Sequence, residues 1–325
     1  MQWYQIGQRS EKLRALNFVI GGRGIGKTYG TLDYIINSGK TFIYLRNTEI
    51  QLQESSTEFG NPFKRWNRDH DRNIVIRSER KHCMIYDFTA EDQPRLIGYA
   101  AALSTFSNLR GVDLSDVDLV IFDEFIERRT LAFQQFEAFA NFYETVSRNR
   151  ELLGEDPLQV FLLSNAQKLD NPILAGYGII PIIEQMMKTG SQEYVSNDLF
   201  IELPQGEVSE AKKQTVNYRL TEGTDYYNET INNLFAHDSF AEIKKRPISE
   251  YTPICALDDM YIWRHKSGND YYVCRTTSNK VPVYSSKDSL SAFLRRYRIP
   301  FGVAAAEHKI FFSEFLIKSK FLSYL

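Results

Sequence analysis

A glycine-rich turn between an apolar segment and a helical pattern constrains the fold of this chain more than any other feature. Residues 15–20 (ALNFVI) are apolar and partly β-branched, as expected for a buried parallel strand. The segment TYGTLDYIINSG, which follows the turn, places Leu32, Ile35 and Ile36 on one helical face. A strand, a glycine turn and a helix in this order predict an α/β domain.

The turn itself has the spacing G-x-x-x-x-G-K-[ST]. Backbone N–H groups of such a turn can converge on phosphate oxygens because glycine has no Cβ, and the helix N-terminus adds partial positive charge. The lysine is expected to reach the β- and γ-phosphates of a nucleotide, and the threonine hydroxyl to bind Mg²⁺. The alternative is an ordinary glycine-rich turn. The predicted phosphate-binding residues are Gly21, Gly22, Arg23, Gly24, Ile25, Gly26, Lys27 and Thr28.

A second apolar segment ends in two acids. In DVDLVIFDEF, residues 116–125, an apolar run is followed by Asp123 and Glu124. Such a strand is buried, and its end emerges at the carboxyl edge of an open α/β sheet, where ligands bind. Asp123 is predicted to contact Mg²⁺, through water, and Glu124 to be the general base that polarises an attacking water. The alternative is a surface pair of acids that closes a strand.

A third strand is predicted at residues 158–167 (LQVFLLSNAQ), which are apolar until Ser164 and Asn165. Asn165 could orient the water or sense the γ-phosphate, or it could close the strand through a local turn. Strands and helices alternate along the chain, which predicts a doubly wound parallel sheet. Further strand candidates, with a β-hairpin between them at 73–88, are residues 41–46 and 97–104.

Two arginines follow a helical pattern between the acidic strand and the asparagine strand. Residues 130–151 (TLAFQQFEAFANFYETVSRNRE) repeat apolar side chains at helical spacing and finish at Arg148 and Arg150. Cations near a helix C-terminus are favoured by its dipole. The functional interpretation is an arginine finger that reaches the γ-phosphate of a neighbouring subunit. Two residues apart on a helix, the arginines face different ways, so only one is expected to be the finger, and spacing alone does not select it.

Composition limits where such a protein can work. The 325 residues are enough for about two domains, and 43% hydrophobic residues favour a folded protein. Three widely spaced cysteines predict a reducing compartment rather than a disulfide framework or a zinc site. Because the sequence has no apolar run of membrane-spanning length and no apolar signal segment at its start, we expect a cytosolic protein without membrane partners.

Four of these motifs together resemble the motifs of a known protein family. The segments LNFVIGGRGIGKTYG, LVIFDEFIE, TVSRNRE and LLSNAQ, in this order and spacing, resemble the genome-encapsidation ATPases of phi-twenty-nine-like small tailed bacteriophages. That family belongs to the additional-strand (ASCE) P-loop ATPases and is related to large terminases. The similarity extends through about residue 200 and is thinner afterwards.

The resemblance implies more than the spacing does. It implies an ATP- and Mg²⁺-dependent motor that forms a homo-oligomeric ring, with a pentamer expected, at the portal of a procapsid. The ring would drive double-stranded DNA inward, with a structural RNA as a further candidate partner. The site of action would be the cytoplasm of the infected bacterium and, transiently, the procapsid vertex. By position within TVSRNRE the trans-acting arginine falls on Arg148, and Arg46 matches an arginine near the nucleotide.

The rest of the chain predicts a smaller second domain. We expect a P-loop ATPase domain at 1–205, a polar linker with some helix at 206–250, and an α+β domain at 251–325. The resemblance implies a degenerate copy of the RNase H-like nuclease fold of terminases for this last domain. Strand signals flank the turn KSGN, and Asp258 and Asp259 are expected on a strand, with side chains on opposite faces.

This last domain is also the more basic part of the chain. Residues 251–325 carry 11 Lys and Arg against 6 Asp and Glu, a balance of +5 within a chain of net charge −2. We expect it to bind or guide nucleic acid without cutting it, although solvated surface charge explains each cluster equally well. The two clusters are Lys244, Lys245 and Arg246, which directly precede this domain, and Arg295, Arg296 and Arg298, which lie within it.

Three other functions remain as alternatives. A complete large terminase would also cut DNA and would need several acids clustered on the C-terminal sheet. A helicase would separate the strands of a forked substrate. A nucleotide-dependent assembly switch would bind nucleotide without turnover coupled to DNA.

Overall fold

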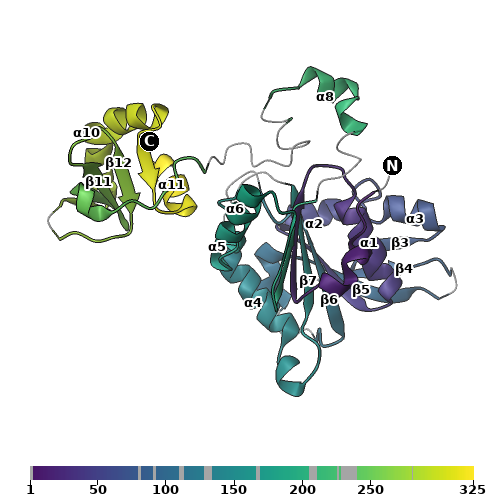
Figure 1. Cartoon of the computed structure of the whole chain (residues 1–325). Coiled ribbons are helices and arrows are strands. Elements are labelled where there is room, and N and C mark those ends of the chain that lie inside the picture. Colours follow the sequence, from purple (N-terminus) through teal and green to yellow (C-terminus); the bar gives the residue numbers. More distant parts are fainter. Residues whose placement is uncertain are drawn as a thin grey trace. The chain divides into compact units, whose positions relative to one another are not determined.

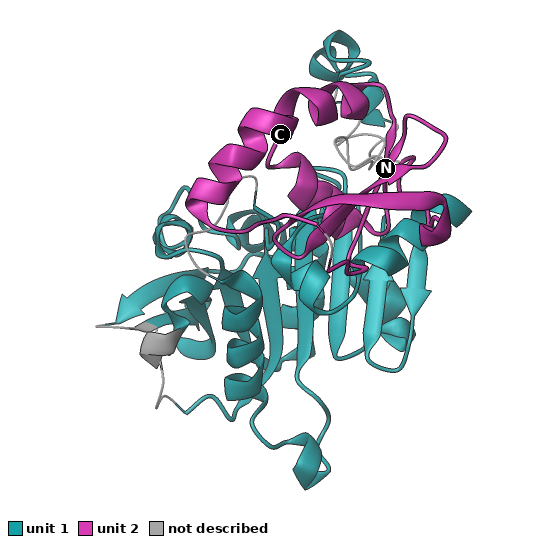
Figure 2. Cartoon of the chain, turned by 90° about the vertical axis from the view of Figure 1, so that its left-hand side faces the viewer, with its two compact units in different colours: residues 1–237 teal, residues 238–325 magenta. Residues whose placement is uncertain are grey.

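The computed structural model divides the chain into two compact units, residues 1–237 and 238–325 (Figure 2). The division falls inside the segment expected as a linker. The structure describes residues 3–79, 82–90, 93–109, 113–127, 134–165, 169–204, 211–224, 227, 240–279 and 281–325.

A large, mostly parallel sheet forms the centre of the first unit (Figure 1). The six strands β5, β2, β6, β7, β1 and β9 run parallel to one another. At the two edges, β4 and β8 pair antiparallel with β5 and β9, and β3 pairs antiparallel with β4. The predicted α/β class with a parallel sheet is therefore confirmed. Among the described residues the nine-stranded order is β3 (Ile74–Glu79), β4 (His82–Asp87), β5 (Arg95–Ala102), β2 (Thr41–Arg46), β6 (Val117–Asp123), β7 (Gln159–Asn165), β1 (Leu16–Gly21), β9 (Leu199–Glu202) and β8 (Glu193–Val195).

Helices cover both faces of this sheet, with α1 and α3 on one face and α4, α5 and α6 on the other (Figure 1). The burial of both faces explains why the central strands are mainly apolar and buried along most of their length rather than alternating between buried and exposed residues. The helices are α1 (Lys27–Ser38), α2 (Glu49–Ser55), α3 (Lys64–His70), α4 (Gln135–Ser147), α5 (Pro172–Gly176), α6 (Ile180–Thr189) and α8 (Val216–Leu220), with 3-10 turns η1 (Ile6–Lys12), η2 (Leu103–Leu109) and η3 (Glu151–Leu153).

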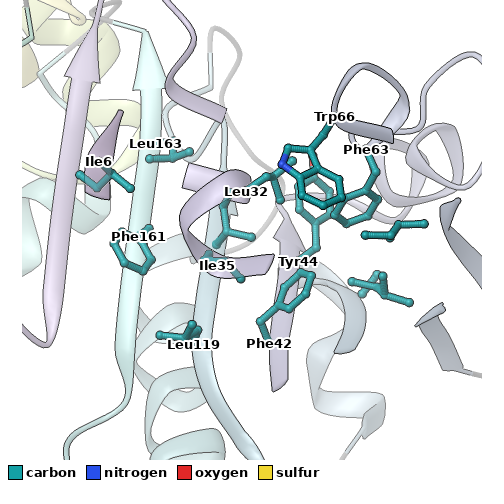
Figure 3. Packing of buried hydrophobic residues seen from close by; sticks show 14 of the residues in the cluster. Ile6, Leu32, Ile35, Phe42, Tyr44, Phe63, Trp66, Leu119, Phe161 and Leu163 are labelled. Atoms are coloured by element: carbon teal, nitrogen blue, oxygen red, sulfur yellow. The ribbon is translucent and has the colours of Figure 1, made fainter. Parts of the chain in front are cut away.

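The core between α1 and the sheet holds the first helix in place. Leu32 and Ile35, which the helical pattern assigned to a buried face, are fully buried there with Phe161, Leu119 and Phe42 (Figure 3). Burying a side chain of this size contributes about 1.5–3 kcal/mol relative to exposure. This packing fixes the N-terminus of α1, and with it the glycine turn, against the sheet.

The second unit is a mixed sheet with two helices. Among the described residues its five-stranded order places the antiparallel meander β10–β11–β12 in the middle, with a parallel strand at each edge. Its core packs α10 and α11 against the sheet through Phe293, Phe301 and Phe321. The elements are β13 (Val283–Tyr284), β10 (Tyr251–Leu257), β11 (Met260–His265), β12 (Tyr271–Cys274), β14 (Ile310–Phe312), α10 (Lys287–Ala306), α11 (Phe315–Leu322) and η4 (Ile248–Glu250).

Residues 240–250, expected as the end of the linker, instead pack onto this second unit. Ile243 forms a bridge with Phe312, and the Glu242 carboxylate accepts hydrogen bonds from Lys318 Nζ (2.8 Å) and lies 2.6 Å from His308 Nδ1. Many residues of this segment are polar, and the contacts that hold it involve residues far away in the sequence. Composition alone could therefore not assign the segment to the second unit. Of the remaining expected linker, residues 206–210, 225–226 and 228–239 lie outside the described part of the chain.

The acids Asp258 and Asp259 do not lie on a strand, contrary to the sequence-based expectation. They form the two-residue turn between β10 and β11, where Leu257 pairs with Met260 and Asp258 has a φ of 51°. Both carboxylates contact Lys320 Nζ, at 3.4 Å and 2.6 Å. Side chains alternate between the two faces of a sheet only in extended strands, so the prediction of opposite faces was wrong for these two turn residues.

Within the described residues, no helix combines the length and the apolar character that crossing a bilayer requires.

Candidate nucleotide-binding site

The candidate site lies where β1, β7 and β6 end side by side. The parallel register pairs Gly21 with Asn165 and Leu163 with Asp123, so these strand ends meet at one edge of the sheet. Because β7 separates β1 from β6, the asparagine strand stands between the glycine turn and the acids. The predicted convergence at the carboxyl edge is thus what the topology produces.

The glycine turn uses backbone conformations that favour glycine. Gly24 and Gly26 have φ values of 67° and 100°, and Gly26 is the N-cap of α1. A Cβ on Gly26 would lie 3.3 Å from the Trp3 ring. The N-terminus of a 12-residue helix therefore opens directly onto the turn, a geometry suited to anions.

Lys27 points back into the turn and is buried. Its Nζ donates to the carbonyl oxygens of Gly21 (2.9 Å) and Gly22 (2.7 Å) and to Asn165 Oδ1 (3.1 Å). Burial lowers the pKa of the Lys27 ammonium to about 7, although the Asp123 carboxylate opposes this shift. A buried ammonium held mainly by neutral carbonyls is suited to receive an anionic ligand.

Asp123 and Thr28 form the oxygen-rich side of the site. Thr28 Oγ1 donates to Asp123 Oδ1 (3.0 Å), and the Tyr44 hydroxyl donates to Asp123 Oδ2 (3.1 Å). Burial raises the pKa of Asp123, while the nearby Arg46 guanidinium opposes the rise. Burial beside this carboxylate also raises the pKa of Tyr44, so its hydroxyl stays a donor.

Glu124 is the more exposed of the two acids and is held by Arg46. Arg46 Nη2 donates to Glu124 Oε2 (2.8 Å), and Arg46 Nη1 lies 3.4 Å from Asp123 Oδ2. Glu124 has a φ of 54°, in the left-handed region, and its carbonyl accepts from Asn47 Nδ2 (2.8 Å). The turn after β6 thus directs the Glu124 carboxylate into solvent-accessible space next to Asp123.

These groups surround one cleft of about 240 Å³. Ile25, predicted as part of the loop, is buried in the core instead of facing the cleft, and Gly21 and Gly22 contribute the carbonyls that Lys27 contacts. The cleft is lined by Arg23, Gly24, Gly26, Lys27, Thr28, Tyr29, Asp123, Glu124, Ser164 and Asn165.

Arg148 lies away from the cleft of its own chain. It is the C-cap of α4, with a φ of 50°, and its guanidinium lies 3.1 Å from Asp113 Oδ1. Asp113 precedes the start of β6, at the opposite end from Asp123. The Arg148 side chain is about half exposed, at 48%. Its position excludes a contact with the cleft of the same chain.

Arg150 does not belong to the helix, which corrects the interpretation of the two arginines as opposite faces of one helical end. Helix α4 ends at Ser147, and Arg150 lies in the following turn, where it is buried. Arg150 Nη2 donates to the Val117 carbonyl (2.7 Å), and Nη1 lies 3.5 Å from Asp118. Val117 begins β6, about 20 Å from its other end at 3.3 Å per residue. Arg150 is thus a structural residue at the amino end of β6, a central strand of the sheet.

Sequence reasoning missed two groups at the site. Tyr44 lies in the middle of an apolar strand, and only its long-range contact with Asp123 reveals its role. Lys212 donates to the main-chain carbonyl of Arg23, 189 positions away in the sequence. The fold and the site together define a P-loop α/β protein.

The chain belongs to the podovirus DNA encapsidation protein (Gp16) family, which matches residues 2–273. The family predicted from the motifs is thereby confirmed. The chain is 30% identical over 241 residues to the DNA packaging proteins of Bacillus phage PZA and of Bacillus phage phi29. Each alignment covers 72% of this chain and 66% of the relative, so the chain spans just under two thirds of the length of these relatives.

Solved structures support the same fold. The chain is similar to a chain of "The bacteriophage Phi-29 viral genome packaging motor assembly", with a TM-score of 0.66 and 22% identity over 99% of this chain and 98% of that chain. For "The Phi-28 gp11 DNA packaging Motor" the TM-score is 0.56, with 18% identity over 99% and 97%. At these identities the similarity concerns the fold alone.

Proposed function

We propose that this chain is the ATPase subunit of a motor that translocates double-stranded DNA into a bacteriophage procapsid. One observation carries the proposal: Lys27, Thr28 and the carboxylates of Asp123 and Glu124 surround a single cleft in a member of a DNA encapsidation family. The names of the Bacillus phage relatives, which are DNA packaging proteins, support the same function here.

ATP and Mg²⁺ are the ligands we propose for the cleft. The Thr28 hydroxyl and the Asp123 carboxylate lie 3.0 Å apart and offer hard oxygen ligands beside the glycine turn, which fits the preference of Mg²⁺. Bound Mg²⁺ supplies charge neutralisation to the phosphates. Lys27 supplies a second positive charge, and the N–H groups of the turn and of the first turn of α1 supply hydrogen bonds.

Glu124 is the candidate general base, because its carboxylate is exposed to the cleft and next to Asp123. Arg46 Nη2 donates a hydrogen bond to this carboxylate. Activation of water requires that the carboxylate accept a proton, so Glu124 must exchange part of this contact for the water. Asn165, whose amide oxygen accepts from Lys27, is proposed to orient the water or to sense the γ-phosphate.

Arg148 is the proposed trans-acting arginine. Its distance from the cleft of its own chain and its half-exposed guanidinium support a role at the cleft of a neighbouring copy. This role requires a homo-oligomeric ring, for which we propose a pentamer. Within the ring each catalytic site would be completed by an adjacent subunit.

We assign the first unit to the additional-strand ATPases, because β7 intervenes between β1 and β6. For the second unit we propose a degenerate nuclease-like domain that binds nucleic acid without cutting it. Both turn acids, Asp258 and Asp259, contact Lys320, and Arg275 bridges Asp259 and Glu314. Among the described residues, no group of three or more His, Cys, Asp or Glu side chains could hold a metal ion.

The partners that follow from this function are double-stranded DNA, the portal of a procapsid and, as a further candidate, a structural RNA. The protein would act in the cytoplasm of an infected bacterium and transiently at the procapsid vertex.

The test compares wild-type protein with Glu124→Gln, which keeps the size of the side chain and loses its basicity. We expect wild type to hydrolyse ATP with Mg²⁺, faster with double-stranded DNA, and to protect DNA from nuclease when procapsids are present. Glu124→Gln should bind ATP and show at least about 10²-fold slower turnover. Glu137→Gln, at an exposed position on α4, is the matched control and should behave as wild type.

The alternatives give different results in the same assays. Nucleotide binding without DNA-dependent turnover favours an assembly switch, and separation of a forked duplex favours a helicase. Mg²⁺-dependent cleavage of a plasmid by the purified protein favours a complete terminase. Loss of ATP binding in Glu124→Gln would assign Glu124 to the structure or to metal binding instead of base catalysis.

A further inference from the structure

A second lysine lies at the phosphate loop, contributed by a distant part of the same unit. Lys212 Nζ donates to the Arg23 carbonyl, and a Cβ on Gly24 would lie only 2.8 Å from this ammonium. Gly24 has a positive φ of 67°, which favours glycine, and it lies next to the Lys212 ammonium. Residues 211–224, which carry Lys212, follow the exit of the chain from the sheet at β9.

Local contacts hold Lys212 in this position. The Lys212 carbonyl accepts hydrogen bonds from the backbone N–H and the hydroxyl of Thr215, both at 2.9 Å. Thr215 is the N-cap of α8, and the Lys212 ammonium lies 5.8 Å from the ring centroid of Tyr218, which is buried. The position of the ammonium is therefore coupled to the turn that begins α8.

The positive charges beside the glycine turn indicate a role for the contact between Lys212 and the Arg23 carbonyl. Lys27 and Lys212 approach the glycine turn from different parts of the chain, and the positive charge of Lys212 is one of the effects that lower the pKa of Lys27, after burial. The Lys212 ammonium donates to a neutral carbonyl, whereas an anionic phosphate oxygen would add the attraction between opposite charges to such a hydrogen bond. An anion in the turn would relieve the repulsion between the two ammonium groups.

We propose that Lys212 binds the nucleotide phosphates together with Lys27, and that this contact couples occupancy of the phosphate loop to residues 211–224. The inference rests on the proposed nucleotide binding and deepens it. In the absence of nucleotide, Lys212 stays on the Arg23 carbonyl. With nucleotide bound, the ammonium exchanges this partner for phosphate oxygen, and the turn into α8 moves with it.

The experiment measures binding of Mg²⁺·ATP to the full chain by calorimetry. Lys212→Met should weaken ATP binding by about tenfold or more, as expected for loss of a hydrogen bond between charged groups. Lys212→Arg, which keeps the charge and a donor, should restore most of the affinity. Lys213→Met, one position further along the same segment, is the matched control and should bind ATP like wild type.

Hydrogen exchange gives the second readout. Saturating ATP should slow exchange of residues 211–224 in wild type and in Lys213→Met but not in Lys212→Met. Wild-type affinity in Lys212→Met, with unchanged ATP protection of this segment, overturns the inference and leaves the proposed function intact. Failure of wild type to bind ATP overturns the proposed function, and this inference falls with it.

Discussion

The two sheets of this protein place charged side chains at strand ends, and they do so with opposite results. In the parallel sheet, β1, β6 and β7 end at one edge, so the loop lysine Lys27, Asp123 and Asn165 face a shared cleft. In the C-terminal meander, Asp258 and Asp259 sit in one tight turn and bind Lys320. The strand ends that converge in the parallel sheet leave room for a ligand, whereas Lys320 of α11 neutralises the two acids of the C-terminal turn.

The pKa shifts follow the same division. Burial raises the pKa of Asp123, although the nearby Arg46 guanidinium opposes the rise. The hydrogen bond from Lys320 lowers the pKa of Asp259, whose charge is already balanced. A buried ionisable group with a shifted pKa in a cleft is typical of a functional site, and a paired surface charge is typical of a structural contact. The predictions below test this distinction.

The largest expected effect is on turnover. Lys27→Ala removes the charge that opposes the β- and γ-phosphates, and Arg148→Ala removes the proposed trans-acting charge. We expect each variant alone to lower ATP turnover by about 10³-fold or more, as seen for arginine fingers. Steady-state ATPase measurements of the two purified variants provide the test.

Mixing the two variants separates a shared site from a self-contained one. Lys27→Ala subunits keep Arg148, so an excess of them should restore part of the activity of Arg148→Ala subunits in mixed rings. Absence of recovery would assign Arg148 a role within its own chain. Arg150 serves as a contrast, since its substitution should lower stability through the lost contact with the Val117 carbonyl.

Sequence patterns predicted those parts of the fold and of the candidate site whose arrangement depends on local order along the chain. The spacing from Gly21 to Thr28, and the acids directly after a buried strand, predicted the loop and its partners across the sheet. Such patterns were insufficient where a contact depends on distant segments: Tyr44, Lys212 and the packing of residues 240–250 leave no periodic signal. The Arg150 interpretation failed because the helix ends three residues before it, and helix ends are poorly determined by pattern.

A second prediction concerns stability of the C-terminal unit. Hydrogen bonds from Lys318 and His308 lower the pKa of the buried Glu242 to about 2, although burial opposes this shift. Glu242→Gln removes the negative charge that Glu242 places beside the buried Lys318 ammonium and should cost about 3 kcal/mol at neutral pH. Hydrogen exchange of β12 in the full chain measures this loss. Glu307→Gln, whose partner Lys309 is exposed, should cost less than about 0.5 kcal/mol.

The same pair gives a pH dependence with a defined sign. A carboxyl whose pKa is lowered in the folded state stabilises the fold at pH values above its ordinary pKa of 4.5. This contribution is lost as the pH falls from 4.5 toward the lowered pKa of about 2. Stability of the wild-type unit should therefore decline across this window, and Glu242→Gln should lack that part of the decline. An identical acid profile in both proteins would contradict the role of Glu242.

A third prediction concerns protons taken up on nucleotide binding. With a pKa of about 7, Lys27 is largely neutral above this pH in the free protein, and bound phosphate favours its ammonium form. ATP affinity should thus weaken by up to about tenfold per pH unit above 7. Calorimetry in buffers of different ionisation enthalpy should detect uptake near one proton at about pH 8 and little at about pH 6. Lys27→Arg, which is always charged, should bind without this uptake.

The smallest expected effect is on nucleic-acid binding by the second unit. Arg295, Arg296 and Arg298 are exposed on α10, although the Arg298 Nε also donates to the Leu325 carbonyl. If these side chains contact phosphates, changing all three to Ala should reduce the slope of log K against log salt by up to about 2.7, or 0.9 per contact. Filter binding of double-stranded DNA and of RNA at several salt concentrations measures the slope.

Incubation of the protein with plasmid and Mg²⁺ or Mn²⁺ tests for nuclease activity. Cleavage that disappears in Asp258→Asn or Asp259→Asn would show that Lys320 leaves these acids free to bind metal. The comparison between the two sheets would then fail, because it assigns both turn carboxylates to Lys320 of α11 and leaves none of them for two metal ions.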